Sequence, residues 1–568
     1  MAELKNVEAD LTRFRRRVWV AALVVILGFS LLVGRLVVLQ VSRHDALDAR
    51  AERNRTSLLP IVPNRGRILD RNGVVLASSY SAYALEVTPS NVPNLDETLS
   101  ELGKLVALTP RDLRRFRQLR AESRSFASLP LKTRLTDEEV ARVAAQNYRF
   151  PGVEIKARLF RTYPYGELGG HVIGYIGRIN EAEKERIEDS DDAGNYRGTE
   201  SIGKLGIEQS YERQLHGTTG IEQVETSASG RAVRTLSTTP AVSGDDVMLS
   251  LDIRLQKLVE DLFGDRRGAL VAIDPRTGEV LAMVSKPSFD PNLFVDGIDV
   301  ESWKELNESV DRPLLNRALR GTYPPGSTYK PFMALAALET GKRGASMVVN
   351  DTGSWTFGGH TFRSHEAAGS VDMRRAIQRS SNVYFYSLAN DMGVDTIHDF
   401  MKPLGFGQIT GLDLGGEVRG VLPSTEWKRN TYRRPEQKRW YAGETISLGI
   451  GQGYNNFTML QLANAMAAVA NHGLQNKPHL VKAIRGPHAQ APEAVVLETP
   501  VNLGYKQQNI QVVLDGMVSV VTDGTGRGVF AGAGYTSGGK TGTAQAVTIG
   551  QKDRYCLLYT SDAADERS

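Results

Sequence analysis

One long apolar segment near the N-terminus constrains the fold of this chain more than any other feature. It runs from Val18 to Val41 and is interrupted by a single charge, Arg35. An apolar helix of this length can cross the roughly 30 Å hydrocarbon core of a bilayer. An arginine near its end can extend its guanidinium to the interface. The sequence therefore predicts a transmembrane helix over residues 18–41, with residues 1–17 as a short tail.

The charges that flank this segment predict its orientation. Arg13, Arg15, Arg16 and Arg17 precede it, and basic residues beside a span favour the cytoplasmic side. We therefore expect a cytoplasmic N-terminus and place everything after the span outside the cytoplasm. A cleaved signal peptide is the alternative, but the apolar run is long for one and no small-residue cleavage site follows it.

The rest of the composition is that of a folded protein with several domains. A chain of 568 residues is too long for one hydrophobic core, and 41% hydrophobic with 24% charged residues is ordinary for globular proteins. A net charge of +4 gives no reason to expect nucleic-acid binding. The single cysteine, Cys556, excludes an intrachain disulfide and a cysteine-based metal site.

Residues 246–284 predict an α+β arrangement. Met248–Leu251 has the pattern of a strand, and Asp252 is a candidate cap for a following helix. Ala269–Ile273 and Glu279–Val284 then predict a hairpin around a proline and glycine turn. Helix and hairpin must pack together to bury their apolar faces. The expected apolar face of the helix consists of Leu255, Leu258, Val259, Leu262 and Phe263.

A first chemical motif is Ser327-Thr328-Tyr329-Lys330. Prolines before it and Gly341 after it predict a helix that begins near Ser327. Residues three apart share a helix face, so Ser327 and Lys330 can approach each other. A serine hydroxyl needs an adjacent base to act as a nucleophile, and a desolvated lysine can be that base. Alone, however, this spacing is common in helices.

Two further motifs supply complementary groups. Ser380-Ser381-Asn382 offers a hydroxyl and an amide, which can relay a proton and hold a peptide carbonyl. Lys540-Thr541-Gly542-Thr543 is expected on a strand whose glycine permits close approach of a ligand carboxylate. Each is weak alone. Together, and in this order, the three motifs are the signature of serine penicillin-recognising enzymes.

The chain resembles class B penicillin-binding proteins over nearly its whole length. Gly268–Pro291, Pro313–Ala318 and Gly321–Pro331 are similar to their transpeptidase domain, and Arg65–Gly73 and Gly203–Arg234 to their non-catalytic pedestal domain. The resemblance implies an α+β protein with an N-terminal transmembrane helix, a β-rich pedestal domain, and a transpeptidase domain in which helices flank an antiparallel sheet.

These observations divide the chain into segments. We expect the pedestal domain over residues 42–245 and the transpeptidase domain over 246–555. Cys556 to Glu566 is similar to a conceptual translation of a sequencing adapter, so residues 556–568 are interpreted as a foreign tail. On that interpretation the natural sequence is cut near Tyr555, and the transpeptidase domain lacks its central strands and final helix.

Three stretches indicate the subfamily. Tyr323–Gly326, Gly449–Tyr454 and Gly539–Gln545 are similar to penicillin-binding protein 2, which cross-links peptidoglycan during cell-wall elongation. The division-specific penicillin-binding protein 3 is the alternative within the class, and a non-catalytic scaffold is the alternative if the domain is incomplete. A β-lactamase is normally a soluble single domain, and a β-lactam sensor would need an intracellular module.

The resemblance implies a role for each motif residue. Ser327 would attack the D-Ala-D-Ala carbonyl of a stem peptide while Lys330 takes its proton, and the N–H groups of Ser327 and Thr543 would form the oxyanion hole. Ser380 would pass a proton to the leaving D-alanine. The remaining implied site residues are Asn382 and Lys540 for catalysis and Thr541, Gly542 and Thr543 for substrate binding.

The resemblance also implies partners and location. The substrates would be nascent peptidoglycan stem peptides, with penicillin and other β-lactams acylating the same serine. A RodA-type glycan polymerase and the elongation complex would bind at the span and pedestal, in the bacterial inner membrane, with the catalytic domain in the periplasm. No cofactor is expected. No metal is expected either, because the second motif has Ser381 where zinc-binding relatives have a cysteine.

Overall fold

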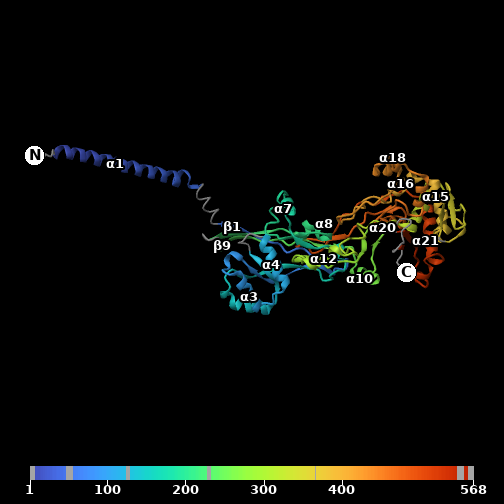
Figure 1. The fold of residues 1–568 in the computed structure, drawn as a ribbon, viewed down its shortest axis with the longest axis horizontal. Coiled ribbons are helices and arrows are strands. Elements are labelled where there is room, and N and C mark those ends of the chain that lie inside the picture. The colour runs from blue at the N-terminus through green and yellow to red at the C-terminus, as the bar shows by residue number, and fades with distance from the viewer. Residues whose placement is uncertain are drawn as a thin grey trace. The chain divides into compact units, whose positions relative to one another are not determined.

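The computed structural model describes residues 7–45, 56–122, 128–226, 232–364, 366–545 and 556–560 (Figure 1). The chain divides into two units. The first unit consists of residues 1–63, 189–198 and 218–242, and the second of residues 64–188, 199–217 and 243–568. The range expected for the pedestal, 42–245, therefore contributes to both units.

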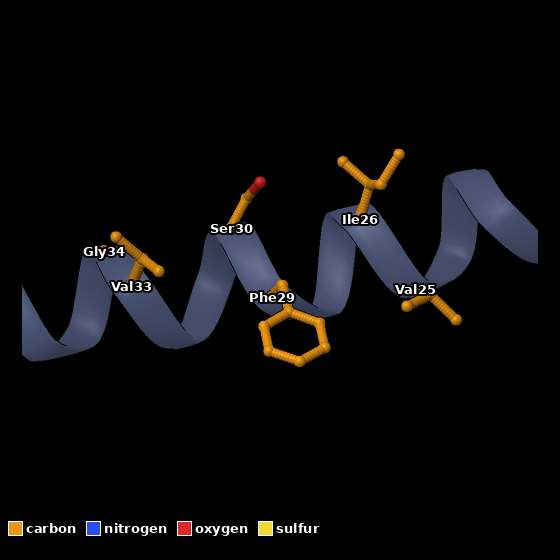
Figure 2. A pocket seen from close by; sticks show the side chains of 6 residues that line it. All are labelled: Val25, Ile26, Phe29, Ser30, Val33 and Gly34. Carbon is orange, nitrogen blue, oxygen red and sulfur yellow. The ribbon is translucent and has the colours of Figure 1, made fainter.

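The first unit contains the expected apolar helix. Helix α1 (Val7–Val37) continues into a π-helical turn, η1 (Val38–Ser42). Residues 11–42 are long and apolar enough to cross a membrane, and their side chains are exposed. Figure 2 shows the residues that line a hollow on this helix, among which Ser30 and Gly34 are small and lie one turn apart. Small residues at this spacing permit close helix packing in membranes.

A three-stranded antiparallel sheet completes the first unit. Its strands are β1 (Thr56–Ile61), β8 (Gly220–Thr226) and β9 (Ala232–Thr239), in the order β1-β8-β9. β8 lies between the other two because residues 56–61 pair with 220–225 on one side and residues 232–239 pair with 221–226 on the other.

The second unit is built around a seven-stranded sheet. Its order is β19-β18-β10-β2-β3-β4, with β5 also paired to β3. The turn at Asn72-Gly73 joins β2 to β3, and Gly73 has the positive φ of +83° that a tight turn needs. The strands are β2 (Ile68–Leu69), β3 (Val75–Val87), β4 (Leu129–Leu135), β5 (Val153–Thr162), β10 (Asp246–Leu249), β18 (Val481–Arg485) and β19 (Glu493–Ala494).

Three helices cover the β3-β4-β5 part of this sheet. They are α3 (Leu95–Leu105), α4 (Pro110–Glu122) and α5 (Asp137–Gln146), and α5 begins with a capping box. Their buried leucines, valines and phenylalanines form one core with the strands. Shorter elements in this part are η2 (Pro89–Asn91), η3 (Asn147–Arg149), α6 (Gly170–Ile173), β6 (Ile176–Arg178), α7 (Glu181–Glu188), β7 (Ser201–Gly203), α8 (Gly206–Ser210) and α9 (Glu212–His216).

The expected strand, helix and hairpin after residue 246 are present. Asp252 caps helix α10 (Ile253–Phe263), and β11 (Gly268–Ile273) pairs with β12 (Val280–Lys286). The expected apolar face of α10 was wrong at two of its five residues, however, because Leu258 and Leu262 are 56% and 62% exposed while the other three are half-buried. The buried Gln256 side chain instead donates to the Met283 carbonyl and accepts from the Met283 N–H, which turns its own side of α10 toward β12.

A bundle of helices forms the main core of the remaining part. The buried residues come chiefly from α13 (Lys330–Glu339), α14 (Met373–Gln378), α15 (Asn382–Met392), α16 (Val394–Met401), α20 (Met459–Ala470) and α21 (Gln507–Thr522). α13 is buried over nearly its whole length. The remaining helical elements are α11 (Asn292–Val295), α12 (Val300–Glu308), η4 (Gly326–Tyr329), α17 (Thr425–Thr431), α18 (Pro435–Lys438), α19 (Ala442–Leu448) and α22 (Arg527–Phe530).

Short two-stranded sheets lie around this bundle. They pair β13 (Val349–Asp351) with β16 (Gly369–Val371), β14 (Ser354–Phe357) with β15 (His360–Arg363), β17 (Leu474–Gln475) with β20 (Val501–Asn502), and β21 (Thr541–Gln545) with β22 (Cys556–Thr560). Among the described residues, no strand joins the β21-β22 pair to the β11-β12 hairpin. The foreign origin of residues 556–568 stays a prediction.

A buried ion cluster ties three distant segments of the second unit together. Glu208, which is fully buried, accepts from Arg161 and Arg65 through bonds of 2.7 Å each. Arg161 also donates to the Gly66 carbonyl, and Arg65 donates to Glu212. Burial raises the pKa of Glu208, but the two arginine charges outweigh it and hold the pKa below its ordinary value. The segments around residues 65, 161 and 208 are thus held at one point.

Replacing Glu208 by glutamine should destabilise this unit strongly. The substitution leaves two arginine charges without their shared buried partner, which costs about 3–5 kcal/mol. The midpoint of thermal unfolding should fall by several degrees, whereas Asp261→Asn, at an exposed ion pair with Lys257, should leave it unchanged. Equal midpoints for the two variants would show that the cluster is dispensable.

Candidate active site

The first motif lies where the chain enters the buried helix α13. Ser327 is in the turn η4, and α13 begins at Lys330 with Pro331 in its first turn, so the helix start expected near Ser327 is confirmed. Ser327 is half-buried, whereas Lys330 is fully buried. The apolar sequence of α13 draws the helix into the core and carries Lys330 with it.

Lys330 connects the first motif to the second. Its Nζ donates to the Ser380 carbonyl at 2.6 Å, to Asn382 Oδ1 at 2.7 Å and to Ser380 Oγ at 3.1 Å. The Ser327 hydroxyl has no hydrogen bond to Lys330 or to any other residue that the structure describes. Catalytic hydrogen bonds are often long before substrate binds, so the shared helix face remains compatible with proton transfer from Ser327 to Lys330.

Lys540, from the third motif, reaches the same hydroxyl. Its Nζ lies 2.9 Å from Ser380 Oγ and 2.8 Å from the Thr541 carbonyl oxygen. The Ser380 hydroxyl therefore lies between two lysine amines. Four of the predicted catalytic residues, namely Lys330, Ser380, Asn382 and Lys540, converge at this point.

Burial changes the protonation of both lysines. The pKa of Lys330 is held well below its ordinary value, first by burial and then by the charge of Lys540, and the carboxylate of Asp351 only partly offsets these effects. Burial lowers the pKa of Lys540 to about 7. Both shifts favour the uncharged amine, which is the form in which Lys330 can accept a proton as a general base.

The second motif has a strained backbone. Ser380 has a φ of +56°, which is unfavourable for a residue with a Cβ, and its N–H donates to the Ile377 carbonyl. Ser381 caps α15 by accepting from the Tyr384 N–H, and Asn382 is the first residue of that helix. Strained conformations persist where the surrounding structure fixes them, and they are frequent at functional sites.

The third motif packs directly on the first. A Cβ on Gly542 would lie 2.8 Å from Thr328 Cγ2, and a Cβ on Gly326 would lie 2.5 Å from the Thr543 carbonyl oxygen. Both positions therefore need glycine for β21 to approach η4. Thr543 is exposed, and the Thr541 hydroxyl is 2.9 Å from that of Thr525. The backbone of β21 thus packs against η4, the turn that carries Ser327.

The structure adds residues that the sequence argument did not assign to the site. The Gly451 carbonyl accepts from the Gly326 N–H at 3.0 Å, and Gln452 Nε2 donates to the Thr543 carbonyl at 3.4 Å. The run of glycines at 449–453 was a signal of close backbone packing that could have indicated them. Within the described ranges, no three His, Cys, Asp or Glu side chains are grouped as metal ligands.

Comparison with known proteins identifies the family. Residues 268–562 match the penicillin binding protein transpeptidase domain, and residues 60–249 match the penicillin-binding protein dimerisation domain. The chain belongs to the class B penicillin-binding proteins. It is 40% identical over 560 residues to the peptidoglycan D,D-transpeptidase MrdA of Escherichia coli K12, which covers 97% of this chain and 87% of the relative.

Solved structures of penicillin-binding proteins share the fold. The chain is similar to Pseudomonas aeruginosa PBP2 crystallised with WCK 5153, at 38% identity, a TM-score of 0.63 and 86% coverage of each chain. It is also similar to Helicobacter pylori PBP2 in a complex with MreC, at 27% identity and a TM-score of 0.73, over 86% of this chain and 89% of that one. The predicted family and its α+β fold class, with an apolar N-terminal helix, are confirmed.

The lowered pKa of Lys540 predicts how the stability of this penicillin-binding protein changes with pH. In the unfolded chain lysine keeps its proton up to about pH 10.4, whereas folded Lys540 loses its proton near pH 7. The unfolded state therefore binds more protons between these values, and folding stability should rise with pH by up to about 1.4 kcal/mol per unit.

Thermal unfolding measured from pH 7 to pH 10 checks this. Lys540→Met should reduce the rise of the midpoint with pH and leave only the part that the lowered pKa of Lys330 contributes, whereas Lys257→Met, at an exposed lysine, should keep the slope of the unmodified protein. An undiminished slope in Lys540→Met would mean that Lys540 does not titrate in this range.

Proposed function

We propose that this chain is a peptidoglycan D,D-transpeptidase that cross-links stem peptides during cell-wall elongation. The observation that carries the proposal is the convergence of Lys330 and Lys540 on Ser380, with the half-buried Ser327 three residues before Lys330. A neutral buried amine next to a serine is what an acyl-transfer nucleophile needs. The relatives named MrdA favour the elongation type over the division-specific type.

In the acylation step the Ser327 hydroxyl attacks the carbonyl of the penultimate D-alanine. An ester bond forms at Ser327 Oγ, and the peptide bond to the terminal D-alanine breaks. Lys330 accepts the hydroxyl proton, and Ser380, which is hydrogen-bonded to both lysines, delivers a proton to the departing amine. The N–H groups of Ser327 and Thr543 stabilise the oxyanion, an effect often worth about 3–4 kcal/mol.

The other motif residues bind substrate. Asn382 holds the substrate backbone, while Lys540, Thr541 and Thr543 attract its terminal carboxylate, and Gly542 lets β21 approach. The amine of a second stem peptide then attacks the ester, forms the cross-link and returns the proton to Ser327. A β-lactam acylates the same serine, because its strained amide takes the place of the D-Ala-D-Ala bond.

Helix α1 and the dimerisation domain are the parts that we expect to attach the chain to the membrane and to partner proteins. We propose that α1 anchors the chain in the bacterial inner membrane with its arginine-rich end in the cytoplasm and the catalytic residues in the periplasm. We also propose that α1 and the dimerisation domain bind a RodA-type glycan polymerase. The complex of a related PBP2 with MreC supports participation in a larger assembly.

Replacing Ser327 by alanine should abolish covalent labelling by fluorescent penicillin, because no other hydroxyl occupies the nucleophile position. Labelling is read after denaturing electrophoresis. Ser370→Ala, at an exposed serine of β16, is the matched control and should label fully. Full labelling of the Ser327→Ala protein would show that another residue is the nucleophile.

The proposed membrane orientation predicts that protease added to spheroplasts digests most of the chain. Only a fragment of about the size of α1 should remain with the membrane, as detected with an N-terminal tag. A cytoplasmic marker protein must stay intact in the same preparation. Protection of the residues around Ser327 until the membrane is lysed would contradict the proposed orientation.

A further inference from the structure

Asp351 is a buried carboxylate beside the second motif. It ends strand β13 and is 1% exposed. Its Oδ2 accepts a 2.5 Å hydrogen bond from the Ser381 hydroxyl, and its Oδ1 accepts from the Gly353 N–H at 2.8 Å. Ser381 is itself 2% exposed. The pair therefore joins β13 to the start of α15 inside the protein.

The segment held by this pair is the one with the strained backbone. Ser380 has a positive φ, and the residues on its two sides must fix that conformation. On one side the Ser380 N–H binds the Ile377 carbonyl, and on the other Ser381 is anchored by Asp351. The Ser381 hydroxyl thus has two functions, because it donates to Asp351 and accepts from the Tyr384 N–H.

We infer that Asp351 is a positioning residue for catalysis, which holds Ser380 and Asn382 on Lys330 through Ser381 and places a negative charge toward Lys330. The inference rests on the proposed roles of Ser327 and Lys330. Asp351 itself does not touch the substrate. It acts through the second motif, which supplies all three oxygens that accept hydrogen bonds from the Lys330 amine. Two of these oxygens belong to side chains and the third is a backbone carbonyl.

The charges around Lys330 define what Asp351 contributes. Lys540 lowers the pKa of Lys330, Asp351 raises it, and no other charged group among the described residues perturbs it. The ring of Phe385 lies 5.6 Å from the Lys330 amine and supplies no formal charge. Removing the carboxylate should therefore lower the pKa of Lys330 further. Because acylation needs neutral Lys330, its rate should then start to rise at a lower pH.

The alternative is that Asp351 only stabilises the fold as a local cap. Asp372 provides the comparison, because its carboxylate caps α14 by accepting from the Arg375 N–H at 2.8 Å but does not perturb Lys330. Losing either carboxylate should reduce stability, whereas only the loss of Asp351 should alter the dependence of acylation on pH.

The experiment measures the second-order rate of labelling by fluorescent penicillin from pH 4 to pH 10, together with thermal unfolding. In Asp351→Asn the maximum rate should fall at least about tenfold, because small displacements of catalytic groups are costly. The acidic limb of its profile should also move to lower pH. Asp372→Asn should lose stability and keep the profile of the unmodified protein. An Asp351→Asn profile that matches Asp372→Asn would overturn the inference.

Two variants of Ser381 separate the positioning effect of Asp351 from the effect of its charge on Lys330. They also test the positioning role if Asp351→Asn does not fold. Ser381→Ala keeps the carboxylate but removes its donor, so the maximum rate should fall without a shift of the acidic limb to lower pH. Ser381→Thr restores a hydroxyl and should recover most of the rate. Equal rates for the alanine and threonine variants would refute the positioning role. Loss of labelling in Ser327→Ala tests the proposed nucleophile independently of these outcomes.

Discussion

The burial of two lysine amines against one serine hydroxyl is the interaction on which the rest of the site depends. Burying an amine away from water is costly unless the amine is hydrogen-bonded, and burial favours the uncharged form of the amine. Lys330 is satisfied by three oxygens of the second motif, and Lys540 by Ser380 and its own strand. The core around α13, the cap of α15 and the position of β21 all serve to maintain this arrangement.

Features of the site and of the fold that depend on a few neighbouring residues could be predicted from the sequence. The spacing of Ser327 and Lys330 is one of them, and the cap at Asp252 is another. The exposed face of α10 could not be predicted in the same way. Hydrophobic periodicity favoured Leu258 and Leu262, but the hydrogen bonds of Gln256 to Met283, which is distant in sequence, decide which side packs.

The strand pairing between the pedestal range and the catalytic range also could not be predicted from local sequence patterns. The sequence places a boundary at residue 246, yet β10 (Asp246–Leu249) pairs in parallel with β2 (Ile68–Leu69) and antiparallel with β18 (Val481–Arg485). Parallel pairing between segments so far apart leaves no signal in either strand. The buried cluster around Glu208 holds the chain just before β2, so this segment and the adjacent strand β10 pack into one framework within the second unit.

The close approach of backbones explains why three weak motifs make one site. Gly326 touches both Gly451 and the Thr543 carbonyl, and Gly542 lies against Thr328, so larger residues would separate the first and third motifs. With the motifs in contact, Lys330 and Lys540 are buried while Ser327 stays partly exposed. The hydroxyl that attacks can therefore be reached by a substrate, whereas the amine that takes its proton is already out of water before the substrate arrives.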